Sequence, residues 1–184
     1  LASAGELLYV AASEASAVRR VDLAEGGTLG TLVGTGLFDF GDADGVGDAA
    51  LLQHPKDVAY AEGLLYVADT YNHKIKQLDP TTRESVTLFG SGTEGWQDGP
   101  AEEARFYEPG GLSVMGSALF IADTNNHSVR VANLESLVVR TLPLSDPDGL
   151  LTQGAAHDGA VLGEDAHLAA VDGAPAGDDA VCGR

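Results

Sequence analysis

The chain has 184 residues, 44% of them hydrophobic, and a formal net charge of −18 from 28 acidic and 10 basic residues. This acidic balance disfavours nucleic-acid binding, because affinity for a phosphate backbone depends on Lys and Arg. No run of 18 apolar residues is present, so no membrane-spanning helix is predicted, and the single cysteine, Cys182, excludes an internal disulfide.

Short apolar runs recur along the chain and indicate strands. Each is rich in Val, Ile, Leu, Tyr or Thr and is bounded by Gly, Asp or Pro, which is typical of antiparallel strands joined by turns. In chain order the main runs are 8–11, 18–22, 28–34, 65–68, 75–79, 84–90, 119–122, 129–133 and 136–144. They fall into three groups of three, which indicates a repeated module.

The spacing of the modules is regular. Tyr9 and Tyr66 are 57 residues apart, and Tyr66 and Phe120 are 54 apart. A second block, DGVGDAALLQHPKDVAY from Asp44, matches DGPAEEARFYEPGGLSV from Asp98 at the same offset of 54. Each unit therefore reads as an Asp-Gly turn followed by four short strands, which predicts the four-stranded antiparallel blades of a β-propeller.

The repeats predict an all-β fold with a partial propeller of two to three blades over 1–144. We expect part of a blade at 1–40 and further blades at 44–90 and 98–144. Residues 145–184 are rich in Ala, Gly and Asp and contain no aromatic residue. Such a stretch offers too little apolar surface to offset the entropy of ordering it, so an acidic tail or linker is predicted there.

A polar motif follows a strand in two modules, as ADTYNH at 68–73 and ADTNNH at 122–127. It either performs chemistry or shapes a turn that each module needs. We favour a turn in which Asp accepts nearby backbone hydrogen bonds, Asn adopts a left-handed φ and His bridges to a neighbouring loop. The first module has Ala12, Ala15 and Ser16 instead, which argues against a symmetric metal site. The predicted turn residues are Asp69, Asn72, His73, Asp123, Asn126 and His127.

These motifs resemble those of a known family. LYVADTYNHKIKQLDP and FIADTNNHSVRV resemble the NHL repeat. With FDFGDADGVG, LLQHP and EPGGL in order, residues 5–144 look like the end of the propeller of NHL-repeat-containing protein 2 and plant and algal suppressor-of-quenching proteins. The resemblance implies a six-bladed ring in a larger protein with a thioredoxin-like domain. It implies cytoplasm for one branch and thylakoid lumen for the other, so the compartment stays open. We interpret this chain as a segment of such a protein.

The loop FDFGDADGVGD at 38–48 has two interpretations. Its carboxylates, Asp39, Asp42, Asp44 and Asp48, suggest a calcium loop. The pattern matches such a loop only in part, since Gln53 stands where a Glu is required, and Trp96 replaces Asp42 in the next module. We favour an inter-blade loop with a tight Asp-Gly turn, held against the body by Phe38 and Phe40.

Four further residues are candidates for binding a partner. Arg19, Lys76 and Arg130 occupy the same place in the three modules of an otherwise acidic chain. They either form salt bridges with acidic loops of the next blade or make a basic ring that docks an acidic partner. Trp96, the only tryptophan, is either a loop anchor or a surface contact.

The function that these features favour is a non-enzymatic scaffold that binds another protein or another domain of the same parent chain. The alternative, implied by the resemblance, is a metal-dependent lyase, for which His54, His73 and His127 are the candidate ligands. No Ser/His/Asp set, phosphate loop or Gly-x-Ser-x-Gly motif is visible. The sequence therefore predicts no catalytic residue, no resident metal and no cofactor.

Overall fold

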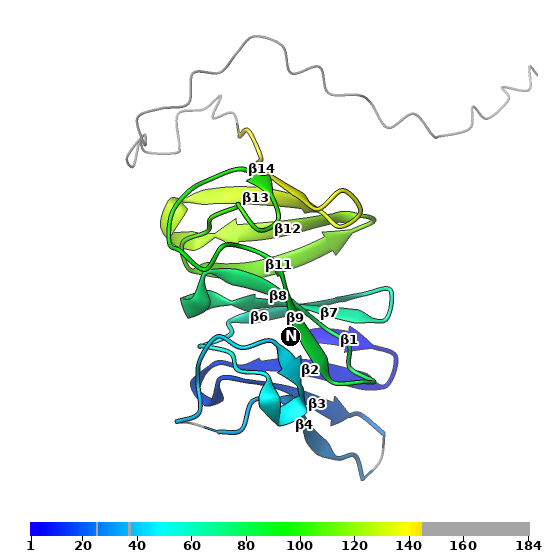
Figure 1. Ribbon diagram of the computed structural model, residues 1–184. Helices are drawn as coiled ribbons and strands as arrows, with labels where there is room; N and C mark the ends of the chain where they lie inside the picture. The colour runs from blue at the N-terminus through cyan, green and yellow to red at the C-terminus, as the bar shows by residue number, and fades with distance from the viewer. Residues whose placement is uncertain (25, 37, 145–184) are drawn as a thin grey trace, which may run out of the picture. The chain divides into compact units, whose positions relative to one another are not determined.

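The computed structural model describes residues 1–24, 26–36 and 38–144, so the expected tail at 145–184 lies outside the described residues. The described part is all-β, and its strands form three antiparallel sheets that follow one another in chain order (Figure 1). Among these residues, no helix is long and apolar enough to cross a membrane.

The first sheet has the strand order β1-β2-β3-β4. The bounds of its strands are β1 Ala2–Ala4, β2 Leu7–Ala12, β3 Ala17–Asp22 and β4 Leu29–Val33. A short 3-10 turn, η1 (Ser13–Ala15), connects β2 to β3.

The second sheet has the order β5-β9-β8-β7-β6, and the third has β10-β14-β13-β12-β11. The second contains β5 Gly45–Val46, β6 Asp57–Ala61, β7 Leu64–Asp69, β8 Lys74–Leu78 and β9 Glu84–Phe89. The third contains β10 Gly99–Pro100, β11 Pro109–Met115, β12 Ala118–Asp123, β13 Ser128–Asn133 and β14 Val138–Thr141. The 3-10 turns are η2 Gly47–Ala49, η3 Thr70–Asn72 and η4 Thr124–Asn126.

The second and third sheets have five strands each, one more than the sequence predicts. The additional strands β5 and β10 lie in the Asp-Gly segments, which we expected to be turns. Each has two residues and pairs antiparallel with the last long strand of its own sheet, as in Gly45 opposite Ser85 and Gly99 opposite Val139. Two residues containing Gly carry no strand signal of their own, so only pairing with the sheet makes them strands.

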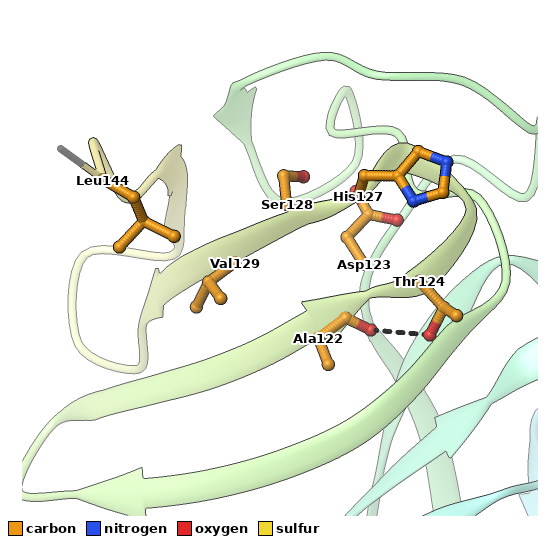
Figure 2. A pocket seen from close by; sticks show the side chains of 7 residues that line it. All are labelled: Ala122, Asp123, Thr124, His127, Ser128, Val129 and Leu144. Carbon is orange, nitrogen blue, oxygen red and sulfur yellow. Dashed lines mark hydrogen bonds between the residues drawn. The ribbon is translucent and has the colours of Figure 1, made fainter. Parts of the chain in front are cut away.

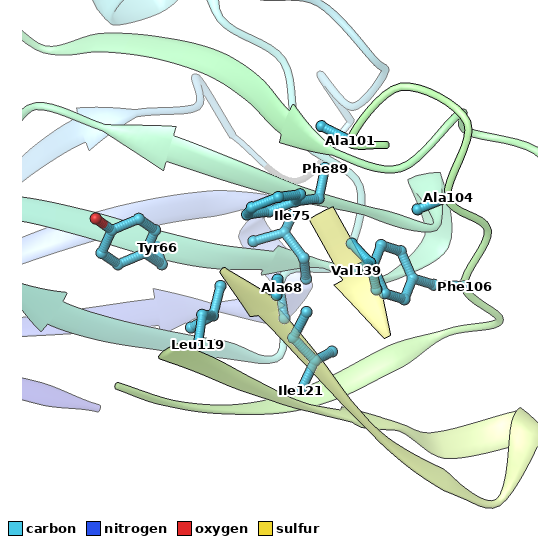
Figure 3. Close-up of a cluster of buried hydrophobic side chains, with 11 residues drawn as sticks. Tyr66, Ala68, Ile75, Phe89, Ala101, Ala104, Phe106, Leu119, Ile121 and Val139 are labelled. Atoms are coloured by element: carbon cyan, nitrogen blue, oxygen red, sulfur yellow. The ribbon is translucent and has the colours of Figure 1, made fainter. Parts of the chain in front are cut away.

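The hydrophobic core lies at the two junctions between successive sheets. One cluster joins the first two sheets and includes Tyr9, Val33, Leu52 and Val67. The other joins the second and third sheets, and Figure 3 shows it. Its buried members are Tyr66, Ala68, Ile75, Phe89, Ala101, Ala104, Phe106, Leu119, Ile121, Ala132 and Val139. Because both faces of the second sheet are covered, β7 is almost continuously buried rather than alternating.

Candidate functional site

The Asp-Thr-x-Asn-His motifs form the turns between the second and third long strands of the second and third sheets. In each, the Asp ends a strand, the next three residues form η3 or η4, and the His adopts a left-handed backbone. The φ angle is 55° at His73 and 49° at His127, and it is 45° at Ser16, which stands in the same place in the first sheet. We expected Asn72 and Asn126 to take this conformation, and that detail is wrong because both lie within the 3-10 turn.

The Asp and Asn of the motif join segments that are distant in sequence. Asp69 Oδ1 accepts the backbone N–H of Gln53 at 2.7 Å, and its Oδ2 accepts Asn72 Nδ2 at 2.8 Å. Asn72 Nδ2 also donates to the carbonyl of Gly41 at 2.7 Å. The turn therefore fastens two stretches of the preceding loop to the end of β7.

The third sheet repeats this arrangement. Asp123 accepts the backbone N–H of Tyr107 at 2.7 Å and Asn126 Nδ2 at 2.8 Å. Asn126 Nδ2 donates to the carbonyl of Gly95 at 2.8 Å. The side chains are thus committed to the same structural contacts in both copies.

The expected hydrogen bonds from backbone groups two residues after the Asp occur at a different turn. Asp22 and Asn133 end the third long strand of their sheets and Asp79 directly follows β8, and each accepts the N–H of the residue two positions later. The placement predicted at Asp69 and Asp123 is wrong because their carboxylates face the loop 16 residues earlier. At Asp69, burial raises the pKa to about 7, although hydrogen bonds from Asn72 and Gln53 act to lower it.

The last residue of the motif connects one sheet to the next. His73 Nδ1 accepts the backbone N–H of Glu108 at 3.2 Å, which joins the second sheet to the loop before β11. At the preceding junction Ser16 Oγ accepts the N–H of His54 at 3.3 Å. The prediction that a His bridges to a neighbouring loop is confirmed for His73. Ser16 shows that a hydroxyl can make the same kind of contact.

The repeated cations are buried rather than presented to a partner. Lys76 and Arg130 have fully buried side chains. Lys76 Nζ donates to Asp42 Oδ1 at 2.9 Å and to Asp44 Oδ1 at 2.8 Å, and Arg130 donates to Asp98 at 2.6 Å and to Asp123 at 2.8 Å. Burial acts to lower the pKa of Lys76, but the hydrogen bonds to Asp44 and Asp42 raise it overall.

The basic-ring hypothesis is therefore wrong for these two cations. The salt bridges also differ in detail from our expectation, because the Asp42, Asp44 and Asp98 carboxylates belong to segments that pair with the same sheet as the cation, not with the next one. Arg19, the third member, is half-buried. In the described ranges no carboxylate lies within salt-bridge distance of Arg19.

The calcium interpretation of the acidic loop does not fit the structure. Asp42 and Asp44 face Lys76, and Asp42 also contacts Lys74. Asp39 accepts a hydrogen bond from Thr35, and Asp48 pairs with Arg83. Protein cations thus already neutralise the central carboxylates, and no group of three metal-ligating side chains occurs within the described residues. Phe38 and Phe40 are exposed, so the expectation that they pin the loop is also wrong.

The remaining candidates do not converge. His54 stacks on Tyr71 with 4.7 Å between ring centroids, and His73 meets the edge of Tyr107 at 5.7 Å. His127 instead lines a hollow on the exposed face of the third sheet, with Ala122, Thr124, Val129 and Leu144 (Figure 2). Trp96 is 40% exposed, and its predicted role as a partner contact stays a prediction.

Comparison with known proteins identifies the module. Residues 52–78 match the family model of the NHL repeat. The chain is an NHL repeat segment. It is 44% identical over 156 residues to human NHL repeat-containing protein 2, which is 80% of this chain and 22% of that protein. It is 47% identical over 133 residues to Protein SUPPRESSOR OF QUENCHING 1, chloroplastic, of Arabidopsis thaliana, covering 68% of this chain and 13% of that protein.

The NHL segment thus spans about a fifth or less of the length of these relatives. Among solved structures, an auxiliary nutrient binding protein from Bacteroides ovatus superposes with a TM-score of 0.63 at 23% identity. That alignment covers 76% of this chain and 36% of the other. At this identity the likeness concerns the fold alone, and it agrees with the three antiparallel sheets.

Sequence reasoning missed several residues that join the sheets. Thr70 Oγ1 donates to the carbonyl of Pro109 at 2.8 Å, and Asp57 Oδ2 accepts the backbone N–H of Leu112 at 2.9 Å. Both pairs cross from the second sheet to the third. A signal was available in the repeat offset, because Gln53 and Tyr107 lie 54 residues apart and each donates to the Asp of its own module.

Proposed function

We propose that this NHL segment is a non-enzymatic scaffold, forming successive blades of a propeller in a longer protein. The observation that carries the proposal is that the repeated polar residues form hydrogen bonds with other parts of the fold. Asp69, Asn72 and Lys76 each contact loop segments of their own module. Their counterparts Asp123, Asn126 and Arg130 do the same. A catalytic group is needed once, whereas a structural contact is needed in every module.

The exposed face of the third sheet supports a longer array. At the previous junction Thr70 is buried and donates to Pro109, and His73 accepts from Glu108. The equivalent Thr124 and His127 are exposed, and among the described residues the one hydrogen bond from Thr124 Oγ1 is to the carbonyl of Ala122, at 3.4 Å (Figure 2). Within the described part of the chain, the groups that bind the next sheet at one junction therefore face no further sheet at the following one.

The partner that we propose is another protein or another domain of the same parent chain, and not a nucleic acid. The net charge of −18 supports this choice, because a strongly acidic surface repels phosphate. The resemblance to NHL-repeat-containing protein 2 supports a parent chain with a thioredoxin-like domain. The exposed Trp96 is the surface residue that we expect to contribute most to such an interface.

The competing function, a metal-dependent lyase, makes a different prediction about metal content. A catalytic zinc needs about three protein ligands that converge on one point. His54, His73 and His127 instead contact Tyr71, Tyr107 and the hollow of the third sheet, respectively. This separation favours the scaffold.

The test combines elemental analysis with two matched substitutions in the 184-residue chain. We expect substoichiometric transition metal after purification without chelators. We also expect His73→Ala to lower the free energy of unfolding by about 1 kcal/mol, since it removes one hydrogen bond, and His127→Ala to leave it unchanged. A stoichiometric metal that either substitution releases would overturn the scaffold proposal.

A further inference from the structure

The fifth strands of the second and third sheets are fixed by one polar arrangement. Before each fifth strand stands an aspartate, Asp44 or Asp98. Asp44 Oδ1 accepts Lys76 Nζ at 2.8 Å and Thr87 Oγ1 at 3.0 Å. Asp98 Oδ1 accepts a guanidinium N–H of Arg130 at 2.6 Å and Thr141 Oγ1 at 3.0 Å.

The cation and the threonine are cross-strand partners in both sheets. Lys76 in β8 lies opposite Thr87 in β9, and Arg130 in β13 lies opposite Thr141 in β14. The pair therefore forms a binding site for one carboxylate at the outer edge of the sheet. The two residues after the Asp then form backbone hydrogen bonds with that edge.

The first sheet contains the same pair of a cation and a threonine. Arg19 in β3 lies opposite Thr31 in β4, in the register that Lys76 and Thr87 have in the second sheet. However, β4 is the outermost strand of its sheet in the part of the chain that the structure describes. Over 1–24, 26–36 and 38–144, no carboxylate lies within salt-bridge distance of Arg19.

Side-chain exposure shows the same difference. In the second and third sheets the residue opposite the fifth strand is Ser85 or Val139, and these are 1% and 0% exposed. The residue at this register in the first sheet is Leu29. It pairs with Val21, just as Ser85 pairs with Leu78 and Val139 pairs with Ala132 at the equivalent positions of the other sheets. Leu29 is 61% exposed. An outermost strand also presents backbone N–H and C=O groups with which a further extended segment can pair.

We propose that the outer edge of β4 binds an extended Asp-Gly segment of a further NHL-type repeat. Its carboxylate accepts hydrogen bonds from Arg19 and Thr31, and its next two residues pair with the backbone beside Thr28 and Leu29. We choose this occupant because its carboxylate complements the charge of Arg19. The same arrangement already holds an Asp-Gly segment in the second and third sheets. The relatives extend far beyond the aligned region, which leaves ample sequence to supply it. The inference goes beyond the scaffold proposal, since the edge would bind this segment whether or not the propeller is an enzyme.

The experiment uses a peptide with the sequence of residues 94–103, EGWQDGPAEE, titrated into the isotope-labelled 184-residue chain. We expect amide chemical-shift changes at residues 28–33 and at Arg19, and none in the third sheet, which already holds its own Asp-Gly segment. A peptide in which the Asp is replaced by Asn (D98N) should bind about tenfold more weakly, because it lacks the charge-assisted hydrogen bonds.

Protein variants complete the test. Arg19→Gln should weaken binding about tenfold, whereas Arg19→Lys should keep it within about threefold, since a lysine makes this contact in the second sheet. Arg20→Gln, an exposed neighbour on the same strand, is the matched control and should bind normally. Equal binding of the D98N peptide, normal binding by Arg19→Gln, or no shift changes at 28–33 at millimolar peptide would each overturn the proposal. If Arg19→Lys keeps a folded spectrum and binds while Arg19→Gln does not bind, the loss reflects the missing cation and not a loss of folding.

Discussion

Two equivalent aspartates differ in how the fold compensates their charge. Asp123 receives the guanidinium of Arg130 at 2.8 Å, with both side chains fully buried. Asp69 is equally buried, but from the described residues its carboxylate receives a backbone N–H and an amide N–H, because Lys76 donates to Asp42 and Asp44 instead. The planar guanidinium of Arg130 can reach Asp98 and Asp123 together, whereas the ammonium group of Lys76 donates to Asp42 and Asp44 and not to Asp69. Equivalent positions in the repeat therefore carry different electrostatic costs.

Asp69 should make the stability depend on pH in an unusual direction. Its folded-state pKa of about 7 lies above its unfolded value of 3.8, mainly because of burial. The folded state therefore binds more protons between these values, and the contribution of Asp69 to stability falls as pH rises from about 4 to about 7. At about 1.4 kcal/mol per pKa unit the change is at most about 4 kcal/mol.

The measurement is urea unfolding at several pH values between 4.5 and 8, for the parent chain and for Asp69→Asn. We expect the stability difference to shift in favour of Asp69→Asn as the pH rises, since the amide does not ionise. Glu102→Gln, at an exposed position, should track the parent chain throughout. Parallel curves for the parent and Asp69→Asn would contradict the assignment.

Arg130→Lys tests whether the guanidinium is required at the third sheet. The ammonium of a lysine cannot reproduce the bonds to Gln97, Arg105, Asp98 and Asp123 together. We expect a loss of about 2–4 kcal/mol in the free energy of unfolding, because the buried Asp123 carboxylate would lose its cation. Arg105→Lys, at an exposed residue, should change stability by less than about 0.5 kcal/mol in the same denaturation assay.

At the scale of elements, a few hydrogen bonds join successive sheets, and one of them, from the loop to the last motif position, occurs at both junctions. Thr70 and Asp57 connect the second sheet to β11, and His73 connects it to the loop before β11. The apolar cluster at the same junction contains Phe89, Phe106 and Ile121. The hydrogen bonds fix how one sheet is placed against the next, while the apolar cluster supplies most of the free energy.

A pair of equivalent threonines isolates one of these bonds. Thr70→Val removes the hydrogen bond to the Pro109 carbonyl and should destabilise the chain by about 1–2 kcal/mol, because that buried carbonyl loses its partner. Thr124→Val makes the same chemical change at an exposed position and should be neutral within about 0.5 kcal/mol. Thermal or urea unfolding of both variants gives the comparison. Equal effects would mean that the hydroxyl at position 70 does not stabilise the junction.

The short strands show what element prediction from sequence can and cannot achieve. The long strands were predictable because runs such as 65–68 combine high β-propensity with turn residues on both sides. The strands β5 and β10 were not, because Gly45–Val46 and Gly99–Pro100 become strands only when β9 and β14 are beside them. The same holds for the candidate site: the motif residues were found, but their partners were not.

At the scale of the whole molecule, charge is the dominant long-range feature. The chain carries a formal net charge of −18, and its buried cations are already paired with carboxylates. Within the described residues, Glu6, Glu84 and Glu102 are among the exposed acidic side chains, and like charges on a surface repel and destabilise the compact state. Salt screens this repulsion over about 10 Å at 0.1 M.

We therefore expect the melting temperature to rise as sodium chloride is increased from about 20 to 200 mM. An uncharged osmolyte at matched osmolality should have a smaller effect, which separates screening from solute exclusion. Scanning calorimetry or circular dichroism provides the measurement. A melting temperature that falls with added salt would show that attractive surface pairs outweigh the net repulsion.

The sequence by itself determined the repeat, the long strands and the positions of the turns between the long strands, because strand propensity, turn residues and a spacing of 54 to 57 residues are all local or periodic properties. Only the tertiary structure decided which groups meet. Gln53 reaches Asp69 across 16 residues, Lys76 reaches Asp44 across 32, and Asp57 reaches Leu112 across 55. No local pattern links such residues, since it is the packing of sheets and loops that brings them together and sets their burial.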